Sequence, residues 1–600
     1  MDKKYTMIVS LATLALLLFY TTPGEAGIRC VNPNGTGGCF DSIQAAVDDA
    51  NPGDTVKIAP GTYFESINIE EKDNLTLLGS SYHGKKVIID PEDSVPCSDS
   101  RELFGGPPDS AGCRQFEIQG NCENAWNIGR EGPASCFWQD GECLGCGPKN
   151  EEDEEGLCTN TCSLALGSGI RVASDDVTIE NLTIRNGKWD GIFVDAEATG
   201  TRVFAVKISG PNIDCIHIEG DDTRVKWSDL RFCGEQCIEA NANDVSIRWN
   251  TITKCGDGGI IASGSNLKIR QNDVSITEQN GILVAGSNLE VVKNWVDVSE
   301  DDGINVAGGA FSVRHNSVTA AADEGIEVNC APCADASRTL YVDPESGEGC
   351  RQFDNQMDCE IAWNIGGEGP ESCFWDSDSE DCESCDPFFA ANGDCENTCV
   401  EGNQTCGDSE VSYNVVSRVG EDECFLINAA FPGLMVKSNK ATHCSEDGFN
   451  INGTGITLSY NSAAYSGGAR DSYGFDISGK DHLLEHNVSR NNHGDGFNLN
   501  NDEDFGPSEI SMITLNNNVA EKNGADGFDV EDGAEDVTLK DNRAKKNNNI
   551  GIEVSDGATD TTVDGNTAFG NRTDFCDEGT DTVGDENNNN FGTTGPCGTD

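Results

Sequence analysis

The stretch EQNGILVAG, Glu278–Gly286, is followed one interval later by EDDGINVAG, Glu300–Gly308. Both copies place a glycine before an isoleucine, a variable residue and a valine, and the interval from Gly281 to Gly303 is 22. Apolar and polar residues that alternate at period two indicate a β-strand with one buried face, and the glycine permits a tight turn before it. The motif therefore predicts a short strand that recurs at a fixed interval.

The same motif position recurs along most of the chain. We call its central residue the marker, and it falls at Gly169, Gly191, Cys215, Cys237, Gly259, Gly281, Gly303 and Gly325, then at Cys424, Gly448, Gly474, Gly496, Gly527 and Gly551. The intervals of the first series are 22 or 24, and the gap from Gly325 to Cys424 is 99. That gap exceeds the length of the block from Cys330 to Cys406 by one period of 22. We therefore predict that the block is an insertion into one repeat.

Each repeat carries three β-like segments, which in one copy are residues 281–284, 289–292 and 295–298. A unit of this size does not bury its apolar side alone, but stacked copies bury a continuous core. We therefore predict a solenoid of stacked coils in which Ile282 and Val284 point inward and Leu283 points outward.

Asparagine forms a second periodic series, which we expect to build a stacked ladder of side-chain amides at one turn of every coil. Its amide both donates and accepts hydrogen bonds, so it satisfies turn backbone groups. The series runs through Asn250, Asn272, Asn294, Asn316, Asn439, Asn461, Asn487, Asn517, Asn542 and Asn566.

Charge and the N-terminus restrict the classes of function. The chain has 104 acidic and 39 basic residues, a formal charge of -65. Such a surface repels nucleic acids and anionic lipids, and it favours either high solubility or binding of calcium by some of the carboxylates. Residues 1–26 have the short basic, apolar and small-residue regions of a secretory signal peptide. No later run is long and apolar enough to span a bilayer, so we expect a secreted, periplasmic or cell-surface protein.

The 28 cysteines of an exported chain are expected to form disulfides. We expect Cys30 to pair with Cys39, Cys330 with Cys406, and Cys576 with Cys597, because each pair stands together at one end or neck. Within the repeats, one period separates Cys215 from Cys237, and one period also separates Cys233 from Cys255. We predict that each of these pairs bridges adjacent coils, with Cys233 to Cys237 as a rival pairing within one turn.

Two cysteine-rich blocks are copies of one module. The sequences CRQF, AWNIG and SCFW occur in both at one constant offset, first at Cys113, Ala125 and Ser135 and again at Cys350, Ala362 and Ser372. We predict small disulfide-stabilised inserts at 97–162 and 330–406, which serve either as stable protrusions or as binding knobs. The remaining boundaries are an N-terminal cap with the first coils at 27–96, coils at 163–329 and 407–575, and a disulfide-closed tail at 576–600.

The repeats resemble the right-handed parallel β-helix of the pectin-lyase-like superfamily. DSIQAAVDDANPGDTVKIAPGTYFESINI, Asp41–Ile69, is similar to the N-terminal segment of its sugar-active members. Its apolar residues Ile43, Ala46, Val47 and Ala50 line one face of a helix, which Asp41 and Gln44 could cap. The resemblance implies an all-β solenoid with an N-terminal helix that covers the open end of the rod.

The resemblance places reaction and binding on the outward face of the first strand of each coil. Four outward residues on neighbouring coils form the best catalytic candidate: Arg171, Asp214, His217 and Glu239. PNIDCIHI, Pro211–Ile218, is similar to a polygalacturonase stretch, but the Asp-Asp pair expected one coil later is Glu235-Gln236 here. Since glycoside hydrolysis needs two placed carboxyl groups, we favour a lyase or epimerase over a hydrolase if the protein is an enzyme.

The C-terminal outward positions carry almost only oxygen donors. They are Asp447, Asn450, Asp476, Asp495, Asn498, Asp526 and Asp529. Stacked carboxylates repel one another, and calcium or a sugar would compensate them. We expect this row to bind calcium, a glycan or both, and Phe497 to stack on a sugar if its ring is exposed. Three functions remain open: binding of an extracellular polysaccharide or surface, a polysaccharide lyase or epimerase, and a structural rod.

Overall fold

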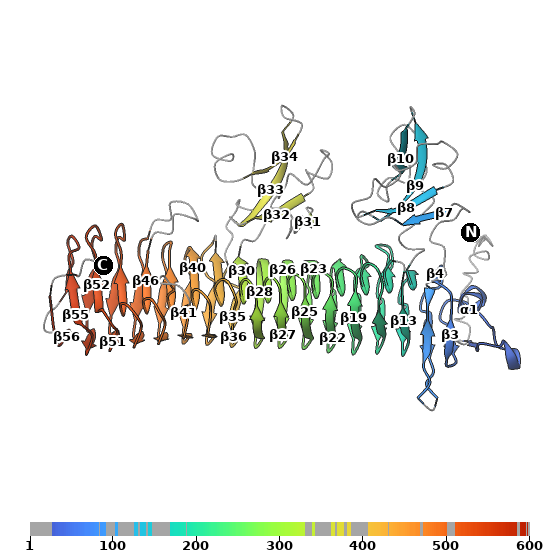
Figure 1. Cartoon of the computed structure of the whole chain (residues 1–600), viewed down its shortest axis with the longest axis horizontal. Coiled ribbons are helices and arrows are strands. Elements are labelled where there is room, and N and C mark those ends of the chain that lie inside the picture. The colour runs from blue at the N-terminus through green and yellow to red at the C-terminus, as the bar shows by residue number, and fades with distance from the viewer. Residues whose placement is uncertain are drawn as a thin grey trace, which may run out of the picture.

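The computed structural model describes residues 27–91 apart from 83, 168–330 apart from 188, 406–500 apart from 430 and 468–471, 510–595 apart from 585–587, and 597. Of the two cysteine-rich inserts it describes eight strands, and the predicted signal peptide lies outside the described residues. The chain forms a long rod of about 17 turns (Figure 1). Almost all of its regular structure is parallel β-strand, which confirms the predicted solenoid. Within the described residues, no helix is long and apolar enough to cross a membrane.

Three ladders of parallel strands run along the rod. The first ladder contains the strands that follow the markers: β4 (Ile67–Glu70), β11 (Ile170–Ala173), β14 (Ile192–Val194), β17 (Ile216–Ile218), β20 (Ile238–Asn241), β23 (Ile260–Ser265), β26 (Ile282–Val292), β28 (Ile304–Arg314), β30 (Ile326–Cys330), β37 (Phe425–Ala429), β40 (Phe449–Gly453), β43 (Phe475–Ile477), β46 (Phe497–Leu499), β49 (Phe528–Val530), β52 (Ile550–Val554) and β55 (Thr573–Asp577).

The second ladder follows the first within each coil, and β26 and β28 are long enough to belong to both. Its other strands are β1 (Ile28–Val31), β2 (Thr55–Ile58), β5 (Thr76–Gly79), β12 (Thr178–Glu180), β15 (Arg202–Phe204), β18 (Arg224–Lys226), β21 (Ser246–Arg248), β24 (Lys268–Arg270), β35 (Glu410–Ser412), β38 (Met435–Lys437), β41 (Thr457–Ser459), β44 (Leu483–Glu485), β47 (Thr514–Asn516), β50 (Thr538–Lys540) and β53 (Thr562–Asp564).

The third ladder completes each coil. It contains β3 (Gly61–Tyr63), β6 (Val87–Ile89), β13 (Thr183–Arg185), β16 (Lys207–Ser209), β19 (Asp229–Cys233), β22 (Thr251–Cys255), β25 (Asp273–Thr277), β27 (Trp295–Ser299), β29 (Ser317–Ala321), β36 (Val415–Ser417), β39 (Lys440–Thr442), β42 (Ser462–Ala464), β45 (Val488–Arg490), β48 (Val519–Glu521), β51 (Arg543–Lys545), β54 (Thr567–Phe569) and β56 (Asn590–Phe591).

The coils on either side of the second insert are direct neighbours. β28 pairs with β35, β29 with β36, and β30 with β37. Ser312 therefore stands beside Glu410, and Ile326 beside Phe425, as if the residues between Cys330 and Cys406 were absent. The predicted insertion into one repeat is correct, and a disulfide joins Cys330 to Cys406 at its neck as expected.

The described strands of each insert form a four-stranded sheet that is separate from the rod. One sheet contains β7 (Glu102–Gly105), β8 (Ala125–Gly129), β9 (Gly132–Gln139) and β10 (Glu142–Cys146). The other contains β31 (Thr339–Tyr341), β32 (Ala362–Gly366), β33 (Gly369–Asp376) and β34 (Asp381–Cys385). The same strand order in both agrees with two copies of one module.

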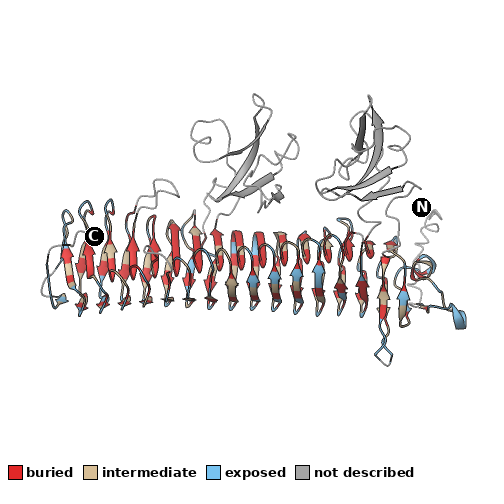
Figure 2. Cartoon of the chain, in the orientation of Figure 1, coloured by how far each residue is buried: buried red, intermediate tan, exposed pale blue. Residues whose placement is uncertain are grey.

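Inward side chains build one continuous core along the rod (Figure 2). Ile282 and Val284 are fully buried, as predicted, and each stacks on its copies in the coils before and after it. In the C-terminal half five buried phenylalanines replace these isoleucines, and their rings stack with centroids 4.6–4.8 Å apart: Phe425, Phe449, Phe475, Phe497 and Phe528. Phe497 is 0% exposed, so the conditional prediction that it stacks on a sugar is wrong.

The predicted asparagine ladder exists, with one wrong member and two missing members, Asn414 and Asn589. Each buried amide accepts from the backbone and side chain of the asparagine one coil earlier and donates to a carbonyl. Asn518, not Asn517, is the ladder residue in its coil, and Asn414 also belongs. Asn517 has a φ of 57°, which asparagine tolerates, and its side chain is exposed. The backbone conformation therefore decides which of the two neighbouring asparagines enters the ladder.

A second asparagine ladder, which the sequence analysis did not identify, follows the third ladder of strands. It contains Asn492, Asn523, Asn547 and Asn571, each bonded to the next through backbone and side-chain donors at 2.7–3.2 Å. Its late start and its irregular intervals made it inconspicuous in the sequence.

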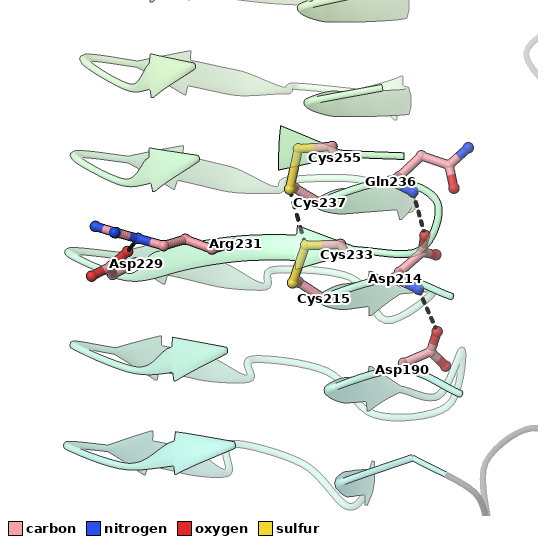
Figure 3. Close-up of a disulfide and its surroundings, with 9 residues drawn as sticks. All are labelled: Asp190, Asp214, Cys215, Asp229, Arg231, Cys233, Gln236, Cys237 and Cys255. Atoms are coloured by element: carbon pink, nitrogen blue, oxygen red, sulfur yellow. Dashed lines mark hydrogen bonds and ion pairs between the residues drawn. A yellow bond between two sulfur atoms is a disulfide. The ribbon is translucent and has the colours of Figure 1, made fainter. Parts of the chain in front are cut away.

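The disulfides of the rod close single coils, which corrects the predicted pairing. Cys215 pairs with Cys233, and Cys237 with Cys255, at a sequence separation of 18 in both cases. The predicted pairs between adjacent coils, Cys215–Cys237 and Cys233–Cys255, do not form, and Cys233 only contacts Cys237 at 3.0 Å between sulfur atoms (Figure 3). The end of the third strand returns to the start of the first within one coil, and this brings the true partners closer than the period suggested.

The other disulfides within the described residues complete this picture. Cys424 pairs with Cys444, again from a marker to the end of the third ladder's strand. Cys30–Cys39 and Cys576–Cys597 form as predicted.

A short helix covers the N-terminal end of the rod. The only 3₁₀-helix of the described residues, η1 (Thr36–Gly38), precedes α1 (Ile43–Asp49), whose Ile43, Ala46 and Val47 are buried. The predicted cap is wrong, because Ser42, not Asp41, accepts from the Ala45 amide at 3.1 Å. The carboxylate of Glu65 accepts the backbone N–H groups of Ile43 and Gln44, the first two residues of the helix. A residue from the following coil therefore completes the cap.

The asparagine ladder generates a testable prediction. The Asn518→Ala substitution leaves the buried amides of Asn487 and the carbonyl of Leu484 without their partner. We expect a loss of about 3 kcal/mol in the free energy of unfolding, because each unsatisfied buried group costs about 1–3 kcal/mol. The adjacent Asn517→Gly substitution is the control, since glycine tolerates its positive φ, and it should cost under about 0.5 kcal/mol. Equal losses in urea denaturation of the two variants would contradict the assignment.

Candidate functional site

Two columns of side chains define the outward side of the first ladder. The strand column contains the second residue after each marker, and paired strands hold its members side by side: Arg171, Phe193, His217, Glu239, Ile261, Leu283, Asn305, Glu327, Leu426, Asn450, Asp476, Asn498, Asp529 and Glu553. Ile261, Leu283 and Leu426 are apolar, and Leu283 is 4% exposed. They divide the polar column into three separate clusters.

The corner column contains the residue before each marker, and its aspartates hold the coils together. Asp190 accepts the backbone N–H of Asp214 at 3.2 Å, and Asp214 accepts that of Gln236 at 2.9 Å (Figure 3). Asp447, Asp495 and Asp526 accept the backbone N–H of Tyr473, Asp526 and Ile550 in the same way. One oxygen of each carboxylate therefore has a structural role, which leaves only the second oxygen for a ligand.

The N-terminal cluster is centred on His217 of β17. Its Nδ1 lies 3.0 Å from Asp214 Oδ2 and 3.0 Å from Glu239 Oε2, and its Nε2 lies 3.6 Å from Glu219 Oε1. The ring stacks on Phe193 of the preceding coil, with centroids 5.1 Å apart. Asp214 is fully buried and the His217 side chain is 18% exposed. Three of the four predicted catalytic residues, Asp214, His217 and Glu239, are thus in mutual contact.

Arg171 does not join this cluster. Phe193 stands between it and His217 in the strand column. Its guanidinium is paired with Asp195 and bonded to Asn68 Oδ1 at 3.2 Å. Arg171 lies in the predicted column but contacts Asp195 and Asn68 instead of the cluster, because an alignment of the coils gives the column and not the contacts of each side chain.

The contacts within the cluster shift the pKa values of its members in different directions. Burial raises the pKa of Asp214 well above its usual value, and Glu239 and Asp190 add to this effect. Burial opposes a charged His217, but its contacts with Asp214, Glu219 and Glu239 outweigh this and raise the pKa of the imidazole. Burial also opposes ionisation of Glu239, yet its hydrogen bond and ion pair with His217 lower the pKa to about 2. These shifts favour an ionised Glu239 beside a protonated His217 and oppose ionisation of Asp214.

Glu235 is a further acid at this site, in the coil after Asp214. Burial raises its pKa to about 7, and the negative charges of Asp257 and Glu239 contribute. A carboxyl group with a pKa near 7 exchanges protons readily at physiological pH. The sequence marked Glu235 only as a possible substitute for a missing aspartate; its burial supplies the stronger signal.

A middle cluster, which the sequence analysis left unassigned, lies on β28 and β30. Asn305 donates to Asp302 Oδ2 at 2.9 Å and to Glu327, and Asp302 accepts the Glu324 amide at 3.2 Å. Burial raises the pKa of Glu327 to about 7 and of Glu324 to about 11. Its members stand in the same two columns, and that position was the signal available in the sequence.

The C-terminal cluster contains the predicted calcium or glycan residues in the strand column. Asn450 donates to Glu423 Oε1 at 2.8 Å, and Asn498 donates to Asp476 Oδ1 at 3.1 Å. Asn498 Oδ1 and Asp529 Oδ1 are buried and have no hydrogen-bond partner within the described residues. Burial raises the pKa of Asp529 well above its usual value, helped by Asp495, Glu553 and Asp526. The cluster is therefore rich in acceptors and short of donors.

Comparison with known families identifies the chain. The family model described as a right handed beta helix region matches residues 198–334 and 394–568, more than half of the chain, so the chain belongs to that family. The right-handed parallel β-helix of the pectin-lyase-like fold, predicted by resemblance, is confirmed. No curated protein sequence matches the chain.

Three solved structures show a weak likeness to the chain. The mannuronan C-5 epimerase AlgE6 A-module of Azotobacter vinelandii is 10% identical, covers 87% of this chain and 93% of its own, and has a TM-score of 0.32. A family 28 exopolygalacturonase of Yersinia enterocolitica is 12% identical, covers 77% and 78%, and has a TM-score of 0.35. A complex of XylC with xylose is 11% identical, covers 76% and 86%, and has a TM-score of 0.39. At these identities the likeness concerns the fold alone.

The buried acids generate a prediction about pH. The pKa is raised to about 6 in Asp190, and to about 7 in Glu235 and Glu327, above ordinary values of 3.8 and 4.5. Between the unfolded and folded values these three groups bind more protons in the folded chain, so they lower its stability as pH rises from about 4.5 to 7. Burial lowers the pKa of His482 to about 4, and this single group acts in the opposite direction. We expect a higher melting temperature at pH 4.5 than at pH 7.5 in the absence of divalent cations. Glu239, with a pKa of about 2, contributes only below this window.

The Glu327→Gln variant tests the cause of this trend. It keeps one acceptor oxygen, for either Asn305 or Asn329, and removes the titrating group. The stability difference between pH 4.5 and 7.5 should shrink by on the order of 1–3 kcal/mol. Glu578→Gln, at an exposed position, controls for the loss of one charge. A wild-type protein that gains stability across this window would contradict the prediction.

Proposed function

We propose that this right-handed β-helix is a secreted protein that binds an extracellular polysaccharide along the strand column, and that its C-terminal cluster holds calcium. The single observation that carries the proposal is the pair of buried acceptors without partners, Asn498 Oδ1 and Asp529 Oδ1, on adjacent strands of one acidic column. A buried acceptor without a donor is costly, and a cation or a sugar hydroxyl supplies what is missing.

The geometry of the coils suits calcium. Adjacent coils are about 4.8 Å apart, and Ca²⁺ binds oxygens at about 2.3–2.6 Å, so an ion between two coils reaches oxygen atoms of both. Asp476, Asn498, Asp529 and Glu553 offer carboxylate and amide oxygens on four successive coils. A cation there would also offset the negative charges of Asp495, Glu553 and Asp526, which add to the effect of burial in raising the pKa of Asp529.

Secretion is supported by the sequence of residues 1–26 and by the disulfides of the rod. Disulfides such as Cys215–Cys233 and Cys424–Cys444 form and persist in oxidising compartments. In that setting a linear polysaccharide, whose hydroxyl groups donate hydrogen bonds along its whole length, fits a linear column of acceptors.

Calorimetry with calcium tests this function. We expect a titration signal and an affinity that increases with pH, because calcium binds the ionised form of Asp529, whose pKa burial raises. The Asp476→Asn plus Asp529→Asn variant should weaken calcium binding at least about tenfold, since it removes two ligand charges. Asp536→Asn plus Asp560→Asn, at exposed turns, is the control with the same change in charge. An absent signal, or equal affinities for the two variants, would rule out the site.

A second function, acid–base catalysis on the bound polysaccharide, is favoured by Glu235. Its pKa of about 7 and its position beside Asp214, His217 and Glu239 give the site both a proton donor and a proton acceptor. A lyase or epimerase removes a proton from a sugar carbon, and a hydrolase donates one to the leaving oxygen. Each of these steps needs a group poised near neutrality.

A polysaccharide panel separates these reactions. Reducing ends with unsaturated products indicate a lyase, reducing ends alone a hydrolase, and changed sugar stereochemistry in NMR spectra an epimerase. For any of these activities, Glu235→Gln should reduce kcat by about 100-fold or more, as removal of an acid–base group does. Glu219→Gln, which removes a more exposed contact of His217, should reduce it far less. Activity that survives Glu235→Gln would exclude this mechanism, and no turnover of any polysaccharide would leave binding alone.

A further inference from the structure

The second ladder carries a concentration of basic residues in a strongly acidic chain. Four consecutive strands, β15, β18, β21 and β24, present six of the 39 basic residues: Arg202, Arg224, Lys226, Arg248, Lys268 and Arg270. We call these six the basic face. They alternate with fully buried residues such as Val203, Val225 and Ile247, so all of them stand on the outward side of the ladder.

Parallel pairing stacks these cations on one another. Arg202 stands beside Arg224, while Lys226 stands beside Arg248, which stands beside Arg270. Unit charges at the coil spacing of about 4.8 Å repel by roughly 1 kcal/mol in water, and by more where water is partly excluded. Burial and the nearby Arg248, Arg224 and Arg202 lower the pKa of Lys226, which agrees with this repulsion.

Only part of this charge is compensated within the rod. Arg202, Arg224 and Arg270 pair with Asp176, Asp222 and Glu290. Among the described residues, no carboxylate lies within ion-pair distance of Lys226, Arg248 or Lys268, and Arg248 Nε is buried without a partner. These cations lack a carboxylate partner even though the chain has 104 acidic residues. The uncompensated cations therefore indicate an external anion.

Two exposed tryptophans border the basic face. Trp227 is 58% exposed and Trp249 is 39% exposed, and their rings are parallel with centroids 5.2 Å apart. Both have positive φ, at 54° and 57°, which a bulky side chain rarely adopts and which asparagine or glycine would adopt more easily. Trp227 also contacts Phe204, with ring centroids 6.0 Å apart, and the two indoles provide a flat aromatic surface beside the cations.

We propose that the basic face, with Trp227 and Trp249, binds a linear anionic polysaccharide that runs along the rod. Carboxylate or sulfate groups would pair with Lys226, Arg248 and Lys268, and sugar rings would stack on the indoles. One sugar unit of an extended chain is similar in length to one coil, so successive units meet successive coils.

This site goes beyond the proposed function, since it lies on another ladder, uses no calcium and involves none of the strand-column residues. Its test is binding of polygalacturonate, a carboxylated chain, and of heparin, a sulfated chain, in the presence of a calcium chelator. We expect binding that quenches tryptophan fluorescence and weakens steeply with salt, as contacts between cations and a polyanion do. Tighter binding of polygalacturonate would identify carboxylate as the preferred anionic group, and tighter binding of heparin would identify sulfate.

Substitutions then locate the site. Lys226→Glu plus Arg248→Glu should weaken binding at least about tenfold and flatten its salt dependence. Trp227→Gly should weaken binding severalfold with an unchanged salt slope, because it removes stacking and no charge. Lys540→Glu plus Lys546→Glu, which makes the same charge change at exposed positions elsewhere on the rod, should have less than about a twofold effect.

Three outcomes would overturn the proposal. They are no binding of either polyanion at low salt, equal losses in the two double variants, and tighter binding of single-stranded DNA through the same residues. Melting curves of every variant show whether the rod stays folded. Because calcium titration of the unchanged strand column is a separate measurement, failure here leaves the proposed function standing, and the reverse also holds.

Discussion

The parallel pairing that sets each residue beside its own copy in the next coil is the constraint on which the rest of the structure depends. Parallel pairing places like beside like, so a choice made once per coil becomes a column along the rod: phenylalanine on phenylalanine, amide on amide, carboxylate on carboxylate. Apolar and amide columns gain from this arrangement, because packing and hydrogen bonds repeat. Charged columns lose, because repulsion repeats as well. Stacking therefore destabilises the rod at the acidic strand column and at the basic face. A ligand of opposite charge would stabilise the rod most at these two places.

Much of this architecture follows from periodicity alone. The markers align the first ladder correctly across the second insert, because the period survives removal of the whole block from Cys330 to Cys406. The outward columns follow from the same alignment, so the sequence alone places Asp214, His217 and Glu239 together. Periodicity fails where a side chain bonds to a residue other than its own copy. Cys215 finds Cys233 rather than its own copy, and Arg171 finds Asp195, since the path of a turn decides which side chains face one another.

Other features depend on single backbone angles or on burial, neither of which repeats visibly in sequence. Asn517 and Asn518 are identical letters, and a positive φ at the first places only the second in the ladder. Glu235 looked like a poor substitute for aspartate, yet burial gives it a pKa near neutrality. The basic face was not predicted, because its six basic residues are dispersed in a sequence with 104 acidic residues. Only the strand pairing shows that they lie side by side.

The coil-closing disulfides have a consequence for how the rod withstands cutting. In an ordinary solenoid a protease that cleaves one exposed turn creates two new chain ends, and unravelling begins there. Between Cys215 and Cys233, and again between Cys237 and Cys255, a cut leaves both sides covalently joined through the bridge. These two rings surround His217 and Glu239, whose mutual position depends on adjacent coils. The most chemically organised part of the rod is thus the part that survives a nick with its geometry intact.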